Sequence, residues 1–470
     1  MLTKHLKRRL TAFNVWSLAF GCIIGFGCFV MPGTTFLKRA GTLGTLIAME
    51  TAALIMLIVS YSYGYMIKKF PETGGEFIYA RRAFGRTHGF ICAWFLGLCY
   101  ICIIPMNATA LCLIFRAVYG DLLQFGFHYT VAGYDIYFGE VLLAIAALIL
   151  FAYVNSRGVH TAGQVQSVFV VILLLGVFII LGGTFFSPDV SAKKLMPMFY
   201  PQDENHGSAL AQIISVLVVT PWAYVGFDTI PQLAEESNFS HDWVKSIMDT
   251  SILAGCFVYI VMTLIAASGI PDNFSSWVIY VEELPNLKGI NGIATFSAAN
   301  KILGKFGVFC VSMSALMAML TGILGFYTAT SRLLYSMARD EMIPSWFMTL
   351  NKNSVPMKAV IFCMSVSMFA PFVGRNALGW TVDMSSLGGA VSLAYTSLAA
   401  VHFARRERRT DMIIFGGVGF VFSVIFALLL LVPISWLNCS LEVPSYFLLM
   451  LWVFLGVIFF LNMNKTQASR

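Results

Sequence analysis

The stretch most able to do chemistry is a glycine-rich segment near the start of the chain, from Gly21 to Gly33. It lies inside an apolar run, Leu10 to Leu37, that contains no Asp, Glu, Lys or Arg and is long enough to cross a bilayer. Three glycines within seven positions each disfavour a helix by about 1 kcal/mol. At mid-membrane, unpaired backbone groups occur only where they face protein or a polar cavity. The segment therefore predicts a broken spanning helix whose bare amides suit a carboxylate and whose bare carbonyls suit an ammonium group or a cation.

A second interrupted segment runs from Thr220 to Ser237. Two prolines ten residues apart, Pro221 and Pro231, flank Gly226, so this span should also break at membrane depth. About five predicted spans separate the two breaks, as expected if two five-helix halves are inverted repeats whose interrupted helices meet at the midplane. A lone kink at Pro or Gly is ordinary in a spanning helix, but it does not account for both interruptions together.

Three carboxylates within apolar segments are candidates for coupling, because ionisable groups are costly to keep in a membrane. Glu50 lies in the second span, Asp228 just beyond the second break, and Asp383 near the outer end of the tenth span. Burial favours the neutral form of a carboxylate, which can then carry a proton. Each also has a structural interpretation: Asp228 as a helix cap, Glu50 as a partner of neighbouring backbone, and Asp383 as a surface group.

The composition identifies the class of protein that must position these groups. The chain has 470 residues, of which 58% are hydrophobic and 11% charged, and its mean hydropathy is +0.80. Soluble domains are about 25% charged, so the sequence indicates a polytopic membrane protein. The net charge of +7 does not indicate nucleic-acid binding, because the basic residues form short clusters between apolar segments. Nine of the ten cysteines lie in apolar runs and only Cys439 in an expected outer loop, which favours small core residues over metal ligands.

Apolar windows of about 20 residues predict twelve spans. They cover residues 12–37, 42–67, 87–117, 138–156, 163–186, 209–234, 245–270, 306–336, 357–375, 381–403, 412–434 and 443–462. The basic clusters fall in alternate turns, at 68–86, 157, 339–358 and 405–409, and basic loops stay in the cytoplasm. We therefore expect a multi-pass protein of the cytoplasmic (plasma) membrane with both termini cytoplasmic, and a basic N-terminus that leads into a retained spanning helix rather than a signal peptide.

Two loops on the expected inner side carry patterns of their own. Residues 70–79 combine glycines with aromatic residues, which predicts a tight turn followed by an interfacial helix. The loop from Ala338 to Pro356 is expected to form ion pairs at an inner gate, although exposed pairs are weak on average.

Five motifs occur in a fixed order at matching topological depths. They are Gly21-x-Ile23-Ile24-Gly25-x-Gly27-x-Phe29-x-x-Pro32-Gly33, Pro71-x-x-Gly74-Gly75-x-Phe77, Asn155-x-x-Gly158, Ala223-Tyr224-x-Gly226-Phe227-Asp228 followed by Ala234-Glu235-Glu236, and Ser331-Arg332-x-x-Tyr335-x-x-Ala338-Arg339-Asp340-x-x-x-Pro344. Over roughly residues 10–406, the chain thereby resembles the amino acid–polyamine–organocation (APC) transporter family, and within it an amino acid permease.

The resemblance implies an all-α, LeuT-like fold of twelve transmembrane helices, ten of which form a 5+5 inverted repeat with broken helices 1 and 6. The transport core would be residues 1–406, with repeat one at about 10–186 and repeat two at about 207–404. Residues 407–470 would form the peripheral helices 11 and 12 and the cytoplasmic C-terminus.

The resemblance also implies a substrate site made largely of backbone. In the family, amides of the helix 1 break hold the substrate carboxylate, and carbonyls from both breaks hold the amino group. Carried over by position, the site is Cys22, Ile23, Gly25, Phe26, Gly27, Trp222, Ala223, Val225 and Gly226, with Asn107 and Tyr224 as candidate pocket walls. For Asn107, a helix–helix hydrogen bond is favoured over a place in the pocket wall.

Two aromatic residues of this set bear on substrate choice. Trp222 is similar in position to the ring that caps the substrate in arginine–agmatine-type members, or it is a wedge packed beside Pro221. Phe26 departs from the family, because many members have Ser or Thr there. A phenylalanine removes a hydroxyl and fills volume, so we expect a small pocket or one with an apolar neighbour for the substrate.

The coupling ion stays open at this level. Sodium-independent relatives often carry a lysine in helix 5 in place of a sodium ion, but this chain has none from Gln166 to Gly183, and Leu173 is expected near that place. Sodium symporters of this fold use hydroxyls on helix 8, where Thr321 and Thr328 stand separately. Proton coupling through Asp228 or Glu50 and simple exchange both remain, with sodium less favoured.

The predicted function is secondary active transport of a small amino acid or related amine by alternating access, proton-coupled or exchanging. The alternative is a facilitative channel or a non-transporting nutrient sensor on the same fold. An enzyme is disfavoured, because HExxH and GxSxG are absent and the seven histidines are scattered. The expected partners are the substrate, the lipid bilayer and, if coupled, protons. No cofactor, metal or nucleic acid is expected, and no partner subunit is indicated.

Overall fold

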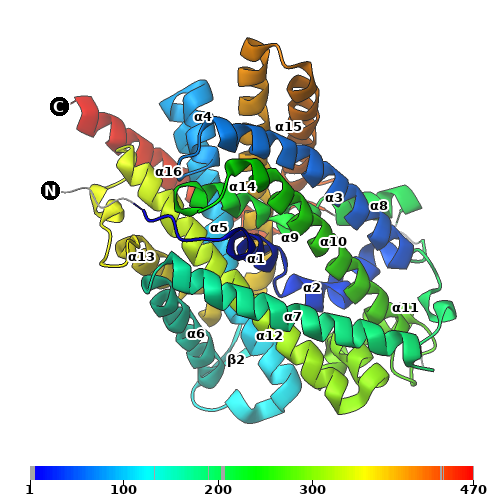
Figure 1. The fold of residues 1–470 in the computed structure, drawn as a ribbon. Helices are drawn as coiled ribbons and strands as arrows, with labels where there is room; N and C mark the ends of the chain where they lie inside the picture. Colours follow the sequence, from blue (N-terminus) through cyan, green and yellow to red (C-terminus); the bar gives the residue numbers. More distant parts are fainter. Residues whose placement is uncertain are drawn as a thin grey trace.

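The structure is a computed structural model that describes residues 6–131, 133–188, 190–202, 207–434, 437 and 439–468, the last seven by their backbone alone. The described chain is almost wholly helical, and its long helices cross one another in one bundle (Figure 1). The helices are α1 Ala12–Ile23, α2 Gly27–Met31, α3 Leu37–Lys69, α4 Glu76–Phe84, α5 Arg86–Tyr119, α6 Phe138–Ser156, α7 Val159–Phe186, α8 Ala209–Leu217, α9 Thr220–Tyr224, α10 Val244–Ser268, α11 Trp277–Glu283, α12 Ala294–Arg339, α13 Met357–Ser367, α14 Asn376–Glu407, α15 Thr410–Leu431 and α16 Val443–Ala468.

The helices agree with a polytopic membrane protein. Among the described residues, nine helical segments are long and apolar enough to span a bilayer, and a pair bent by 48°, residues 209–217 and 220–236, would make a tenth. Two shorter apolar helical segments cover residues 12–23 and 357–372. Each of the twelve apolar windows predicted from the sequence falls on helical chain. Two long helices bend at glycines with positive φ, α3 at Gly41 and α12 at Gly304.

Burial separates a central group of helices from an outer one. Side chains of α5 and α12 are buried along most of their length. In contrast, α15 and α16 expose large apolar side chains such as Ile414, Leu428 and Phe454, as expected for surfaces that face lipid. The helix α15 packs on α14 and α3, and α16 packs on α14 and α5. The last two helices therefore lie outside the central packing.

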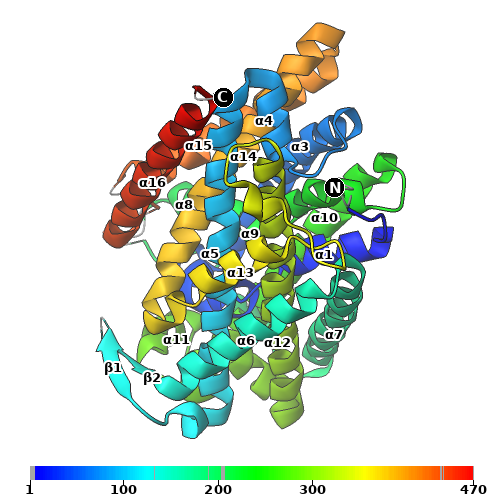
Figure 2. The same ribbon diagram turned by 90° about the vertical axis from the view of Figure 1, so that its left-hand side faces the viewer.

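A short β-hairpin that the sequence did not predict marks one end of the molecule. Strands β1, His128–Val131, and β2, Tyr134–Tyr137, pair antiparallel. Asn376 holds the hairpin to the start of α14 by donating from Nδ2 to the carbonyl of Val131 at 2.9 Å. Figure 2 shows the hairpin at the lower end and α4 at the upper end. We call these two ends the hairpin face and the α4 face.

One expectation about a loop is wrong in part. The predicted helix after residue 75 exists as α4, but its first turn, residues 76–80, is buried in protein instead of lying on the membrane surface. The reason is the turn before it: a Cβ on Gly74 would lie 2.3 Å from Ser336 Oγ, so the glycine lets the loop pack directly against α12. Cys439 lies in the loop between α15 and α16, where it is buried, and like the other nine cysteines it is a free thiol.

Candidate functional site

Both predicted interruptions are present, and they touch. The helix α1 ends at Ile23, Ile24 is extended (φ −92°, ψ 93°), and α2 begins at Gly27. The second interruption falls at Val225 and Gly226, between α9 and the 3₁₀ helix η4, Phe227–Glu236. Gly226 has φ +148°, and a Cβ there would lie 2.6 Å from the backbone nitrogen of Ile23. Only glycine allows this approach, so the two breaks share one contact at the centre of the bundle.

The break between α1 and α2 leaves backbone groups without partners. The N–H groups of Gly25 and Gly27 donate to no other described residue, and Gly25 is only partly buried. The N–H of Phe26 donates to Asn107 Oδ1 at 3.3 Å. The carbonyls of Cys22 and Ala223 accept no hydrogen bond from another described residue. Bare donors and bare acceptors on touching segments are the arrangement that suits a zwitterion.

Asn107 joins α5 to this break. Its Nδ2 donates to the carbonyl of Ile103 one turn back on α5, at 3.0 Å, while its Oδ1 faces Phe26. The side chain therefore makes the helix–helix hydrogen bond considered as an alternative, and it does so at the break itself.

Two aromatic rings narrow the space at the break. The rings of Phe26 and Trp222 have centroids 5.7 Å apart. A Cβ on Gly27 would lie 2.2 Å from Trp222 Cη2, so the indole rests directly on the backbone of α2. Trp222 thus packs across the break and not only beside its neighbour Pro221.

The remaining predicted site residues are engaged with other helices. The carbonyl of Ile23 accepts from the hydroxyl of Tyr259 at 3.4 Å. Tyr224 turns its hydroxyl to α3, where it donates to the carbonyl of Met49 at 2.9 Å. Val225 packs near Gly389 of α14, where a Cβ would lie 3.1 Å from Val225 Cγ2. Ile23, Tyr224 and Val225 therefore hold the break against α10, α3 and α14, respectively.

Asp228 makes the capping contact that the sequence suggested. Its Oδ1 accepts from the N–H of Gly226 at 2.6 Å, and Tyr100 donates from its hydroxyl to Oδ2 at 3.0 Å. Its side chain is 1% exposed and forms no ion pair with a cation of the described chain. Asp228 is therefore a buried acidic group held by the break itself.

The other two candidate carboxylates lie away from the break. Glu50 is on the exposed side of α3, and no hydrogen bond or ion pair joins it to another described residue. Asp383 accepts from the N–H of Glu442 at 2.9 Å and from Ser445 Oγ at 2.7 Å, so it caps the start of α16. Asp383, expected to be a surface group, is thus partly buried and acts as a helix cap instead.

Leu173, expected near the place where sodium-independent relatives carry a lysine, is buried on α7. The α7 side chain that contacts both α1 and α12 is that of Gln166. Its Nε2 lies 3.5 Å from the carbonyl of Ser17 and 3.3 Å from that of Thr321. The two α7 residues are seven positions apart, about two helical turns on one face.

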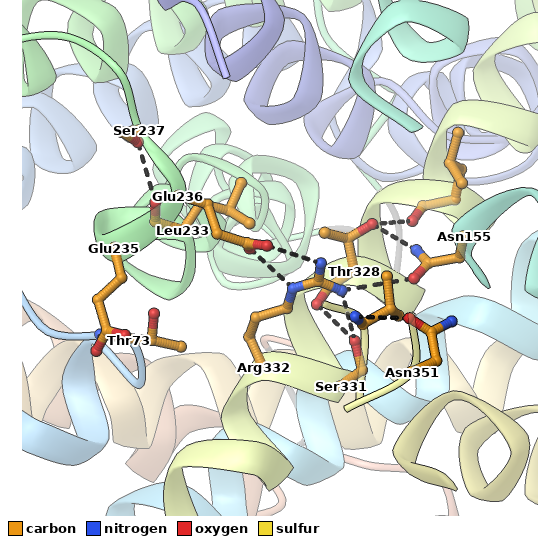
Figure 3. Close-up of polar contacts among 12 residues, drawn as sticks. Thr73, Asn155, Leu233, Glu235, Glu236, Ser237, Thr328, Ser331, Arg332 and Asn351 are labelled. Atoms are coloured by element: carbon orange, nitrogen blue, oxygen red, sulfur yellow. Dashed lines mark hydrogen bonds and ion pairs between the residues drawn. The ribbon is translucent and has the colours of Figure 1, made fainter. Parts of the chain in front are cut away.

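A buried ion pair closes the α4 face. Arg332 of α12 and Glu236 at the end of η4 form a bidentate pair, Nε to Oε2 at 2.9 Å and Nη2 to Oε1 at 3.1 Å, with both side chains 1% exposed. Figure 3 shows the guanidinium between Glu236 and Asn155. The remaining guanidinium nitrogen, Nη1, donates to Ser331 Oγ at 3.0 Å.

Further contacts extend this closure toward the loop before α4. Arg339 pairs with Glu235 at 2.8 Å and Arg81 with Asp340 at 2.5 Å, so ion pairs are present at the start of the loop from Ala338 to Pro356. The segment ahead of α1 also contacts this face, because the N–H groups of Arg9 and Leu10 both donate to the carbonyl of Glu236, at 2.9 and 3.1 Å. The α4 face is therefore sealed by main-chain and side-chain contacts together.

A cavity of about 500 Å³ approaches the break from the opposite end. It is lined by β2, by the end of α5, by Val30 of α2 and by Thr34, which follows α2. Arg116 stands in its wall, paired with Glu140 at 2.5 Å and with its guanidinium 4.5 Å from the ring centre of Tyr134. The break is thus approached from the hairpin face and sealed from the α4 face.

The described part of the chain offers no evident metal centre. Within it, no three His, Cys, Asp or Glu side chains are grouped closely enough to hold an ion. The chemistry available at the break is the binding of a polar solute by backbone groups.

Comparison with known proteins identifies the family to which the chain is similar. The family described as amino acid permease matches residues 10–460. The chain is 25% identical to the methylthioribose transporter of Bacillus subtilis, over 98% of this chain and 95% of that relative. It is 24% identical to the branched-chain amino acid permease of Lactococcus lactis, over 86% of this chain and 83% of the relative. It is also 24% identical to the lysine-specific permease of Lactococcus lactis, over 86% and 77%.

Proposed function

The chain belongs to the amino acid permease family of the APC transporters, and from this premise we propose that it moves a small amino acid or related amine by alternating access, with proton coupling or by exchange. The family makes it a multi-pass membrane protein and a secondary amino acid transporter, not an enzyme. The alternative of a channel or sensor is not favoured, because the relatives are named as permeases and transporters.

The proposed fold is the LeuT-like arrangement of twelve spans. In it, α1 and α2 form the broken helix 1, and residues 209–236 form the broken helix 6. The direct contact between Gly226 and Ile23 supports the pairing of these two helices across two inverted repeats. We propose repeats at about residues 10–186 and 207–404 within a core of residues 1–406, with α15 and α16 as the peripheral helices.

We propose that the α4 face is cytoplasmic and that both termini lie on that side. The basic residues near this face, among them Lys68, Arg81, Arg339 and Arg405, support the orientation, since positively charged loops stay inside. The protein then has its cavity open to the outside and its cytoplasmic side sealed.

The single observation that carries the proposed binding mode is the pair of touching breaks with unpartnered backbone groups. The substrate carboxylate would meet the N–H groups of Gly25 and Gly27, and the amino group would meet the carbonyls of Cys22 and Ala223. Asn107 would release the N–H of Phe26 when a carboxylate arrives, because a charged acceptor binds an amide more strongly than a neutral one.

The rings of Phe26 and Trp222 support a substrate with a short or apolar side chain. They lie against each other over the break and leave little room there. Relatives named for branched-chain amino acids fit this choice, whereas the lysine-specific relative shows that the family also accepts cationic substrates.

The proposed coupling is independent of sodium. The amide of Gln166 lies where carbonyls of α1 and α12 converge, and a Cβ on Gly21 would be 2.5 Å from its Nε2. A neutral donor in that place satisfies oxygen atoms that would otherwise suit a cation. Asp228, buried beside the break without a cationic partner, is the proposed proton carrier, and exposed Glu50 is a weaker candidate.

Counterflow in proteoliposomes tests the proposal. Vesicles loaded with one unlabelled amino acid at a time should accumulate the same labelled amino acid transiently and saturably, in potassium and in sodium buffer alike. A channel would equilibrate label without this transient excess, and a sensor would not move it. A parallel thermal-shift screen would identify the ligands, because a bound substrate stabilises the folded state.

A further inference from the structure

Glu76 is a second fully buried carboxylate, and the proposed mechanism does not yet use it. It is the first residue of α4, and its side chain is 0% exposed. Gly75 before it has φ +46°, and a Cβ there would lie 2.7 Å from Pro231 Cβ. This close approach between the loop and η4 brings Glu76 into the protein, next to the segment that carries Asp228.

Two neutral side chains hold the Glu76 carboxylate. The hydroxyl of Tyr63 donates to Oε1 at 3.0 Å, and Gln232 donates from Nε2 to Oε2 at 2.8 Å. Within the described chain, no lysine, arginine or histidine pairs with it. A buried carboxylate needs either a cation or a proton to be stable, and the surroundings supply no cation.

Among the described residues, the ionisable groups that interact electrostatically with Glu76 are acids, phenols and thiols. They are Tyr63 on α3, Tyr79 on α4, Asp228 on η4, and Cys92, Cys99 and Tyr100 on α5. On α12, Arg339 reaches the carbonyl of Thr73 but pairs with Glu235. On α14, Tyr395 and His402 contact Phe84 at the other end of α4.

These surroundings favour the protonated form. Burial raises the pKa of the Glu76 carboxyl well above its usual value, and the nearby charge of Asp228 raises it further. The hydrogen bonds from the backbone, Tyr63 and Gln232 act in the opposite direction, but burial is the larger effect.

Gln232 also offers the acceptor that a protonated Glu76 requires. Its Oε1 is buried and accepts no hydrogen bond from the described residues, although Nε2 of the same amide contacts Glu76. An amide can present either atom by turning over. Oε1 would then accept the proton of Glu76, and the unpartnered oxygen would gain a partner. A carboxyl that alternates between charged and neutral forms thus fits this position.

We propose that Glu76 delivers the coupled proton to the α4 face. It holds the proton while this face is closed and gives it to water when the loop before α4 separates from η4 and α12. In that step the O–H bond of the carboxyl breaks and the carboxylate remains, to be protonated again in the next cycle. The proposal deepens the proposed proton-coupled function and rests on it.

Glu76 lies close enough to Asp228 for the charge of one carboxylate to act on the other. Asp228 shares a hydrogen bond with Tyr100, and Glu76 shares one with Tyr63. The ring of Tyr63 lies 5.4 Å from that of Phe227, the residue before Asp228. Two carboxyl–phenol pairs therefore stand side by side between the substrate site and the α4 face.

Infrared difference spectroscopy of the purified protein at stepped pH tests this directly. A protonated carboxyl has a C=O stretching band that an ionised one lacks. We expect such a band at neutral pH to be lost in Glu76→Gln, shifted in Tyr63→Phe, and retained in the matched control Glu50→Gln. A band that Glu76→Gln leaves unchanged overturns the proposal. If that variant does not fold, an unshifted band in Tyr63→Phe overturns it instead.

A transport measurement separates this inference from the proposed function. Proteoliposomes are given a tritiated mixture of the twenty protein amino acids, with or without a pH gradient. Glu76→Gln should keep exchange at equal pH and lose accumulation driven by the gradient. Retained accumulation overturns the proposal, and so does the loss of exchange, which would indicate a structural role. If the wild-type protein exchanges no amino acid, the proposed function fails, while the infrared band still reports whether Glu76 holds a proton.

Discussion

At the scale of single residues, the contacts of Asp228 are compatible with both interpretations that its position in the sequence left open. Its bond to the N–H of Gly226 is a cap, and its burial without a cation is what a proton carrier needs. The two roles can be separated, because asparagine keeps an acceptor oxygen for the cap but cannot ionise.

We expect Asp228→Asn to exchange substrate while its uptake becomes independent of external pH. Counterflow and initial uptake rates between acid and neutral pH would measure the two properties. Asp228→Ala serves as the control for the cap and should lose about 1 kcal/mol of stability. If Asp228→Asn keeps the pH dependence of the wild type, only the capping role remains.

Glu76 should make stability depend on pH. Burial and the charge of Asp228 raise the pKa of this carboxyl in the folded protein. Its contribution to stability is therefore complete below the ordinary glutamate pKa of about 4.3 and is lost as the pH rises through the raised value. We expect the unfolding temperature, followed by tryptophan fluorescence, to fall less steeply with pH in Glu76→Gln than in the wild type. Equal slopes would contradict this.

Phe26 should limit the range of substrates. Phe26→Ser removes one of the two rings over the break and adds a hydroxyl, so larger or more polar amino acids should compete for counterflow. Phe26→Leu, which stays apolar, is the matched control and should keep the profile of the wild type. An unchanged profile in Phe26→Ser would show that the ring does not limit the pocket.

At the scale of elements, the seal of the α4 face depends on one buried ion pair. Arg332→Met leaves Glu236 buried without a partner, which costs the closed arrangement about 3–5 kcal/mol. We expect faster hydrogen exchange in residues 6–11 and 233–238, measured by mass spectrometry.

Two further variants control this prediction. Arg339→Met removes a half-exposed pair and should cost at most about 1 kcal/mol. The double variant Arg332→Met, Glu236→Leu replaces the pair by apolar groups and should recover much of the protection. Protection in Arg332→Met equal to that of the wild type would remove the pair from any part in closure.

The interruptions of the two helices were predictable from the sequence because their cause is local. Glycines and prolines disfavour a helix wherever they stand, so Gly25, Gly27 and Gly226 could be identified as break positions without knowledge of their neighbours. The same holds for the apolar windows, each of which falls on helical chain.

The roles of Gln166 and Glu76 depend on distant residues and were missed for that reason. Gln166 contacts Ser17 and Thr321, which lie far away in the sequence. From the sequence alone, Glu76 resembles an exposed loop carboxylate, because its burial depends on the contact of its loop with η4. The sign that could have drawn notice to Glu76 is its position directly after two glycines, since such a turn allows close packing.

At the scale of the whole molecule, the cavity and the seal lie at opposite ends. A cysteine introduced at Val30 or Thr34, in the cavity wall, should react with a membrane-impermeant thiol reagent added to intact cells. A cysteine at Ser336, buried on the α4 face, should not. Cells with the wild-type protein give the background from the ten native thiols, which are mostly buried. Labelling at Ser336 without labelling at the cavity would reverse the proposed orientation.

The strand-like contact of Arg9 and Leu10 with Glu236 has a practical consequence. Their N–H groups donate to the carbonyl of Glu236, whose carboxylate pairs with Arg332. The segment ahead of α1 is therefore bound to the residue that forms the buried ion pair of the α4 face. We expect a purification tag or fluorescent protein fused ahead of this segment to weaken these hydrogen bonds. The protein would then favour the form that is open at the α4 face. Fusions placed after α16, which packs at the periphery, should leave that balance undisturbed.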